Sequence, residues 1–108
     1  MVSNKLKEIL STINGFQRYR YDDDMARKYI SLISEAVELI EGLETTPTSM
    51  LDNAKTETIT ELSNELASRM NESFFNSPVD RKKSEFQISK VLVAVSIGNV
   101  VANMSPTD

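Results

Sequence analysis

The chain has 108 residues with 12 basic and 16 acidic side chains, a net charge of −4, and it contains no cysteine and no histidine. The length fits a single domain, residues 1–108, and the 40% hydrophobic and 26% charged content is typical of a globular protein. Without cysteine or histidine, the chain cannot form a disulfide, a Cys- or His-based metal site, or a catalytic group built on a thiol or an imidazole. We expect no cofactor.

The sequence shows no targeting segment. The N-terminal residues lack the apolar stretch of a secretory signal. The most hydrophobic run, residues 91–101, has 11 residues, whereas a helix that spans a bilayer needs roughly 20. We therefore expect a cytoplasmic protein that does not enter a membrane.

Apolar residues recur with helical spacing through the first half of the chain. A first helix is predicted to begin at a cap on Ser3 and to end at Gly15 in a left-handed conformation. A second is predicted to begin at the carboxylates 22–24, which suit a helix N-terminus, and to end near Gly42. The apolar stripes of the two helices are Leu6, Ile9, Leu10 and Ile13, and Met25, Tyr29, Leu32, Ile33, Ala36, Val37, Ile40 and Leu43.

A third helix is predicted after the break at residues 45–49. It begins near Ser49, where Ser49 and Asp52 have the spacing of a capping box, or later at Thr58, which has the same spacing to Glu61. Its predicted core positions are Ile59, Leu62, Leu66, Met70 and Phe74.

The last segment, residues 80–104, is apolar nearly all round from Val91 onward, which is typical of a buried central helix. A strand is the alternative, because apolar residues alternate from Val91 to Ile97 and Gly98-Asn99 could form a hairpin turn. No other segment offers a partner strand. We predict an all-α, single-domain bundle of about four main helices with the last helix buried. The sequence leaves open whether residues 88–104 form an oligomer interface instead of a core helix.

Negative charge is concentrated in the middle of the chain. Residues 35–72 carry nine carboxylates and two basic side chains, a net charge of −7. At 100° per residue, four of these carboxylates fall on one face of the third helix, opposite its apolar stripe. We interpret them as a surface for a positively charged partner, with two carboxylates of the second helix beside them, although a merely solvated face would have the same pattern. These predicted partner-binding residues are Glu57, Glu61, Glu65 and Glu72, with Glu38 and Glu41.

Aromatic and basic residues interleave in the predicted first loop. Phe16, Tyr19 and Tyr21 alternate there with Arg18 and Arg20, and tyrosine and arginine are enriched at protein–protein hot spots. The three aromatic residues are therefore candidate anchors for a partner. Alternatively, Phe16 and one tyrosine close the end of the bundle.

Glutamates recur in two segments of the predicted helices, ISEAVEL at residues 33–39 and ELSNEL at residues 61–66. The first segment resembles the E-E-x-x-E-L motif, and the second the E-L-x-D motif, of the MazG-type all-α nucleoside triphosphate pyrophosphohydrolases. The resemblance implies Glu35, Glu38 and Glu61 as Mg²⁺ ligands, consistent with the preference of Mg²⁺ for oxygen. Ser34 and Asn64 stand where the family has carboxylates.

The sequence thus favours a small acidic binding protein over an enzyme. We expect it to neutralise or regulate a basic protein partner, as bacterial immunity proteins and antitoxins do, for example by masking the basic active site of a nuclease toxin. Direct binding to nucleic acid is disfavoured because acidic surfaces repel phosphate. The alternatives are a degenerate MazG-like pyrophosphohydrolase and a structural or assembly subunit.

Overall fold

The computed structural model describes residues 2–16, 21–43, 49–69 and 71–104, and these residues form helices and no strand. The helices are α1 (Val2–Gly15), α2 (Asp23–Glu41), α3 (Ser49–Arg69), α4 (Glu72–Phe75) and α5 (Val79–Ala102). Four of them are long, which confirms the all-α bundle. Residues 91–97 are helical, so the hairpin alternative is wrong.

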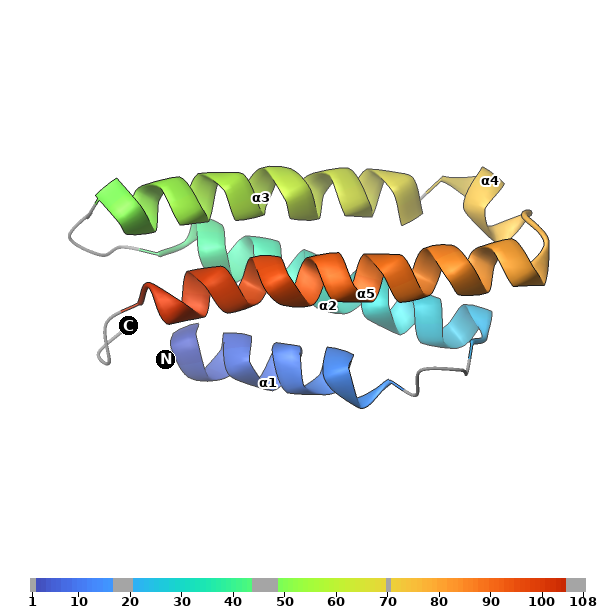
Figure 1. The fold of residues 1–108 in the computed structure, drawn as a ribbon, viewed down its shortest axis with the longest axis horizontal. Helices are drawn as coiled ribbons and strands as arrows, with labels where there is room; N and C mark the ends of the chain where they lie inside the picture. The colour runs from blue at the N-terminus through green and yellow to red at the C-terminus, as the bar shows by residue number, and fades with distance from the viewer. Residues whose placement is uncertain (1, 17–20, 44–48, 70, 105–108) are drawn as a thin grey trace.

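The long helices lie side by side around α5 (Figure 1). In this view α5 lies in front of α2, with α3 along one side and α1 along the other. Helix α5 packs against α1, α2 and α3, and α2 also packs against α1 and α3. The molecule measures 46 × 23 × 17 Å along its principal axes.

The helix ends follow the sequence signals in part. Asp22 caps α2, because its carboxylate accepts a hydrogen bond of 2.6 Å from the backbone N–H of Met25. Helix α3 begins at Ser49, so the later start at Thr58 is wrong. Ser3 does not cap α1 but lies buried in its first turn. Gly15 is the last residue of α1, and no described glycine has a positive φ, so the left-handed ending is also wrong.

The core is built from one face of each long helix. On α1 and α2 it matches the predicted stripes closely. On α3, Leu62 is buried and Ile59 and Leu66 are partly buried, but Phe74 belongs to α4 and Met70 lies outside the described residues. The buried hydrophobic residues are Leu6, Ile9, Ile13, Ala26, Tyr29, Ile33, Ala36, Ile40, Leu51, Leu62, Phe74, Phe86, Val93, Ile97 and Val100.

Helix α5 is not buried all round, contrary to the prediction. Ile88, Val91, Leu92 and Val95 are 61%, 65%, 52% and 58% exposed. The neighbouring helices cover only the opposite face, where polar and charged residues lie among the apolar ones: Lys82, Ser89, Lys90 and Ser96. Of the two lysines, Lys90 donates to the backbone carbonyl of Phe16, and burial lowers the pKa of its ammonium group.

The helix also meets the length and composition criterion for crossing a membrane. It has 24 residues, and its most apolar 18-residue window has a mean hydropathy of 1.3, although the run considered from sequence was only 11 residues long. Core helices of helical bundles meet the same criterion. The polar residues on its inner face pack against other helices of the bundle.

Aromatic rings close one end of the bundle around Phe86. The rings of Phe16, Tyr21 and Tyr29 lie 6.1, 5.4 and 5.2 Å from it between centroids. Tyr21 also contacts Phe74, at 6.5 Å. This confirms the alternative in which Phe16 and a tyrosine plug the bundle end. Tyr19 lies outside the described residues.

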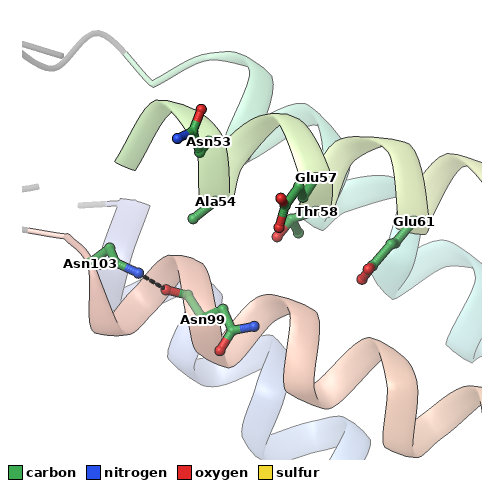
Figure 2. Close-up of a pocket in the computed structure, with 7 residues that line it drawn as sticks. All are labelled: Asn53, Ala54, Glu57, Thr58, Glu61, Asn99 and Asn103. Atoms are coloured by element: carbon green, nitrogen blue, oxygen red, sulfur yellow. Dashed lines mark hydrogen bonds between the residues drawn. The ribbon is translucent and has the colours of Figure 1, made fainter. Parts of the chain in front are cut away.

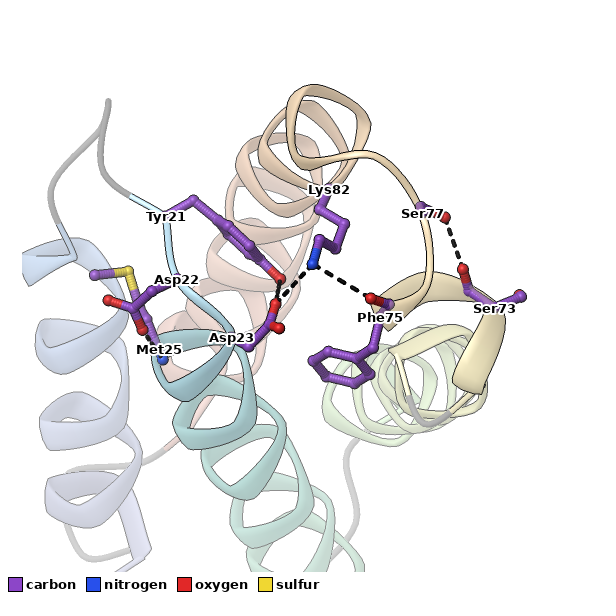
Figure 3. Close-up of polar contacts among 8 residues, drawn as sticks. All are labelled: Tyr21, Asp22, Asp23, Met25, Ser73, Phe75, Ser77 and Lys82. Atoms are coloured by element: carbon purple, nitrogen blue, oxygen red, sulfur yellow. Dashed lines mark hydrogen bonds and ion pairs between the residues drawn. The ribbon is translucent and has the colours of Figure 1, made fainter.

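A buried lysine ties three helices together at this end (Figure 3). The ammonium group of Lys82 on α5 donates to Asp23 Oδ1 at 2.9 Å and to the carbonyl of Phe75 at 3.3 Å. Tyr21 donates to the same carboxylate oxygen at 2.9 Å. The hydrogen bond from Lys82, and then that from Tyr21, holds the pKa of Asp23 below its ordinary value of 3.8.

Replacing Lys82 with methionine should lower the free energy of unfolding by about 1 kcal/mol at neutral pH, since Asp23 is partly solvated. Because the pKa of Asp23 is lowered on folding, its contribution is complete above pH 3.8 and is lost as the pH falls through the lower folded-state value. The difference from the wild type, measured by urea unfolding, should therefore shrink in acid. Lys83→Met, on the adjacent residue, is the control, and an equal loss in it would contradict the role of Lys82.

Candidate protein-binding surface

Two carboxylates of α3 point at α5. Ser89 Oγ donates to Glu65 Oε2 at 2.6 Å, and Ser96 Oγ donates to Glu61 Oε2. Both serines are buried on the inner face of α5. Tyr29 Oη lies 2.6 Å from Ser89 Oγ, and since the serine hydroxyl has one hydrogen, which it gives to Glu65, the tyrosine is the donor. A chain of hydrogen bonds thus links α2, α5 and α3.

The predicted acidic face is therefore arranged differently from the helical-wheel expectation. Glu57, Glu61 and Glu65 run along the edge of α3 next to α5, rather than opposite the core, and we call them the carboxylate row. Glu57 and Glu61 are exposed and Glu65 is half-buried. Glu72 lies on the separate short helix α4, because α3 ends before Asn71, whose side chain caps α4 by accepting from Ser73 N.

A polar groove lies where the carboxylate row meets the C-terminal half of α5 (Figure 2). Its volume is about 460 Å³. Glu57 and Glu61 line it from α3, while Asn99 and Asn103 line it from the α5 side. The side-chain amide of Asn103 donates to the carbonyl of Asn99 at 2.8 Å. With Asn53 on α3, the groove thus offers two carboxylates and three asparagines, which suit a cationic group.

Four exposed hydrophobic residues in the middle of α5 lie beside this groove. Ile88, Val91, Leu92 and Val95 occur at i, i+3, i+4 and i+7, so they form one continuous line, here called the apolar stripe. On the α1 side the stripe borders a groove of about 710 Å³ that also includes Ile13 and Phe16. On the α3 side Leu92 shares a smaller groove, about 220 Å³, with Glu61 and Glu65.

The other predicted binding residues do not join this surface as expected. Glu38 and Glu41 are exposed on α2 and are not among the residues that line the polar groove. Phe16 and Tyr21 pack on Phe86, although Phe16 also lines the α1 groove, and Tyr21 bonds to Asp23. The main contacts of these two aromatic side chains are internal, so their first role is to pack the end of the bundle.

The carboxylates implied by the MazG resemblance are not gathered either. Glu35 and Glu38 are exposed on α2, while Glu61 accepts from Ser96 on α5. Within the described part of the chain, no group of three acidic residues is placed to hold a metal ion.

Sequence reasoning missed the apolar stripe and the asparagines. The signal for the stripe was present, since its spacing is that of a second helical face inside a run that is apolar nearly all round. Ser89 and Ser96, seven residues apart, are two helical turns from each other and marked the face that turns inward. The asparagines carry no such pattern.

Removing the Ser89 hydroxyl tests the hydrogen-bonded chain between α2, α5 and α3. Ser89→Ala should lower the free energy of unfolding by about 1–2 kcal/mol, because a buried donor and acceptor is lost between two other polar groups. Ser84→Ala, at an exposed position of the same helix, should change it by less than about 0.5 kcal/mol. Equal losses of unfolding free energy in the two variants, measured by chemical denaturation, would contradict the role of this hydrogen-bonded chain.

The surface where α3 meets α5 combines polar and apolar groups. It places carboxylates and amides directly beside exposed aliphatic side chains. Such a combination complements a protein surface that is both basic and apolar. Comparison of the chain with protein-family models, curated proteins and solved structures finds no match.

Proposed function

We propose that this chain is a small acidic binding protein that neutralises or regulates a basic protein partner, as immunity proteins and antitoxins do. The observation that carries the proposal is the carboxylate row beside the apolar stripe. Nuclease toxins are the partner class that fits best, since an active-site cleft that binds phosphate is basic.

The two parts of the surface have different roles in binding. The carboxylates raise the rate of encounter with a basic partner and disfavour acidic ones, and this effect weakens as salt screens the charges. The apolar stripe supplies area that binding removes from water. Exposed aliphatic side chains in a continuous line on a small protein are typical of such an interaction site.

The serines of α5 prepare the carboxylate row for binding. Glu61 and Glu65 are held by hydrogen bonds from Ser96 and Ser89, so their side chains are already ordered. An ordered side chain loses less conformational entropy when a partner binds, by roughly 0.5–1.5 kcal/mol per side chain. These hydrogen bonds between α5 and α3 therefore favour recognition as well as folding.

Affinity capture from a lysate of the host cell tests the proposal. The wild-type bait should retain one basic protein at low salt and release it in a salt gradient, and the free chain should inhibit the activity of that protein. The double variant Glu61→Gln/Glu65→Gln keeps hydrogen-bond acceptors for the serines but removes both charges, and its affinity should fall at least about tenfold.

The matched control is Glu35→Gln/Glu38→Gln, which removes the same charge from exposed positions on α2. This variant should retain the partner as the wild type does. Equal retention by all three baits, or equal loss in both variants, would contradict the role of the carboxylate row.

A further inference from the structure

We infer that the apolar stripe binds a second copy of this chain, with the two α5 helices antiparallel. This inference does not rest on the proposed function. The two share a surface, so a basic partner would compete with the second copy. The evidence is the arrangement of apolar, basic and acidic groups along α5, which is complementary to itself under a twofold rotation.

The stripe is symmetric about its own midpoint. A twofold axis that passes between Val91 and Leu92, perpendicular to α5, places Ile88 of one copy opposite Val95 of the other. Val91 and Leu92 then meet their counterparts at the centre. The grooves on both sides of the stripe leave room for these side chains to interdigitate. Most soluble oligomers are symmetric, and twofold dimers are the commonest.

The same rotation brings a basic side chain to the polar groove. Arg81 lies about 16 Å before the midpoint of the stripe, so it comes opposite residue 102 of the second copy, between Asn99 and Asn103. Arg81 and Asn99 are 18 residues apart, five full helical turns, so both lie on the side of α5 that faces α3. The rotation places the α3 side of α5 in one copy next to the α3 side of α5 in the other. Arg81 therefore reaches the groove that Glu57 and Glu61 line.

Arg81 is available for this contact. Its side chain is 70% exposed, and its pair with Glu85 at 3.1 Å is made through Nε alone. A guanidinium group has four further N–H donors on its terminal nitrogens, in a geometry that suits a carboxylate. The small side chain of Ala102 lies directly opposite and leaves space for it.

The size of the contact is also adequate. Residues 81–102 of α5 extend over about 32 Å. Over the 23 Å width of the molecule, this face gives a contact of at most about 700 Å² per copy, within the range of specific interfaces. One feature opposes association: Glu61 of one copy faces Glu65 of the other. We therefore expect a dissociation constant in the micromolar range.

Sedimentation equilibrium of the isolated chain tests the inference. At about 0.1 mM the wild type should have twice the 12.1 kDa mass of one chain. Val91→Asp, at an exposed position beside the axis, should sediment as a folded monomer with unchanged helix content. Arg81→Glu should weaken the dimer at least about tenfold, and so should Glu57→Lys. Combining the two substitutions exchanges the charges and should restore association.

Lys83→Glu is the matched control, since it changes the net charge as Arg81→Glu does but lies on the side of α5 that faces α1. It should leave the dimer intact. A monomeric wild type overturns the inference, and so does a dimer that persists in Val91→Asp or a charge exchange that fails to restore it.

The variant Glu65→Gln separates this inference from the proposed function. It removes the charge that faces Glu61 of the other copy and leaves Glu57 and Glu61 for Arg81, so it should tighten the dimer while it weakens capture of a basic partner. If the dimer tightens and capture is unchanged, the proposed function fails and the inference stands; if the dimer does not tighten, the facing of the two rows is wrong.

Discussion

The hydrogen bonds of Ser89 and Ser96 to Glu65 and Glu61 determine how α5 sits in the bundle. A buried hydroxyl without a partner costs free energy, and Ser89 has a carboxylate acceptor only when the inner face of α5 lies against α3. Ser96 also lies 3.0 Å from the carbonyl of Leu92 on its own helix, and contact with α3 gives it the charged acceptor Glu61. Lys82 adds to this constraint, since its ammonium group reaches Asp23 from the same face. With these residues turned inward, the four residues of the apolar stripe must face outward.

This rotation of α5 creates the surface on which the functional argument rests. The carboxylates that satisfy the serines are held at the edge of the apolar stripe, and the asparagines near the end of α5 extend the polar part into a groove. A fully apolar last helix would have no hydroxyl groups to hold the carboxylates of α3 beside it. Stability and recognition therefore depend on the same contact between α3 and α5. Conservative substitutions are needed to measure the two effects separately.

Much of the fold could be predicted because the first two helices have clear periodicity and α2 has a strong cap at Asp22. The orientation of α5 was missed, since a segment that is apolar nearly all round shows no single apolar face, and serines such as Ser89 and Ser96 are more often exposed than buried. The acidic residues of α3 were misplaced for a related reason. A helical wheel measures angles from the stripe of one helix, and it does not show that a second neighbour, α5, will cover the edge where Glu61 and Glu65 lie.

The most direct test of this account is thiol labelling of two single-cysteine variants, which the absence of native cysteine makes specific. Val93→Cys and Val95→Cys replace the same residue type two positions apart, one 1% exposed and the other 58% exposed. In dilute, native solution, where chains are separate, the thiol at position 95 should react as fast as a free thiol. The thiol at position 93 should react at least about 100-fold more slowly, because it needs local opening of the bundle. Equal rates, or faster reaction at position 93, would contradict the orientation of α5.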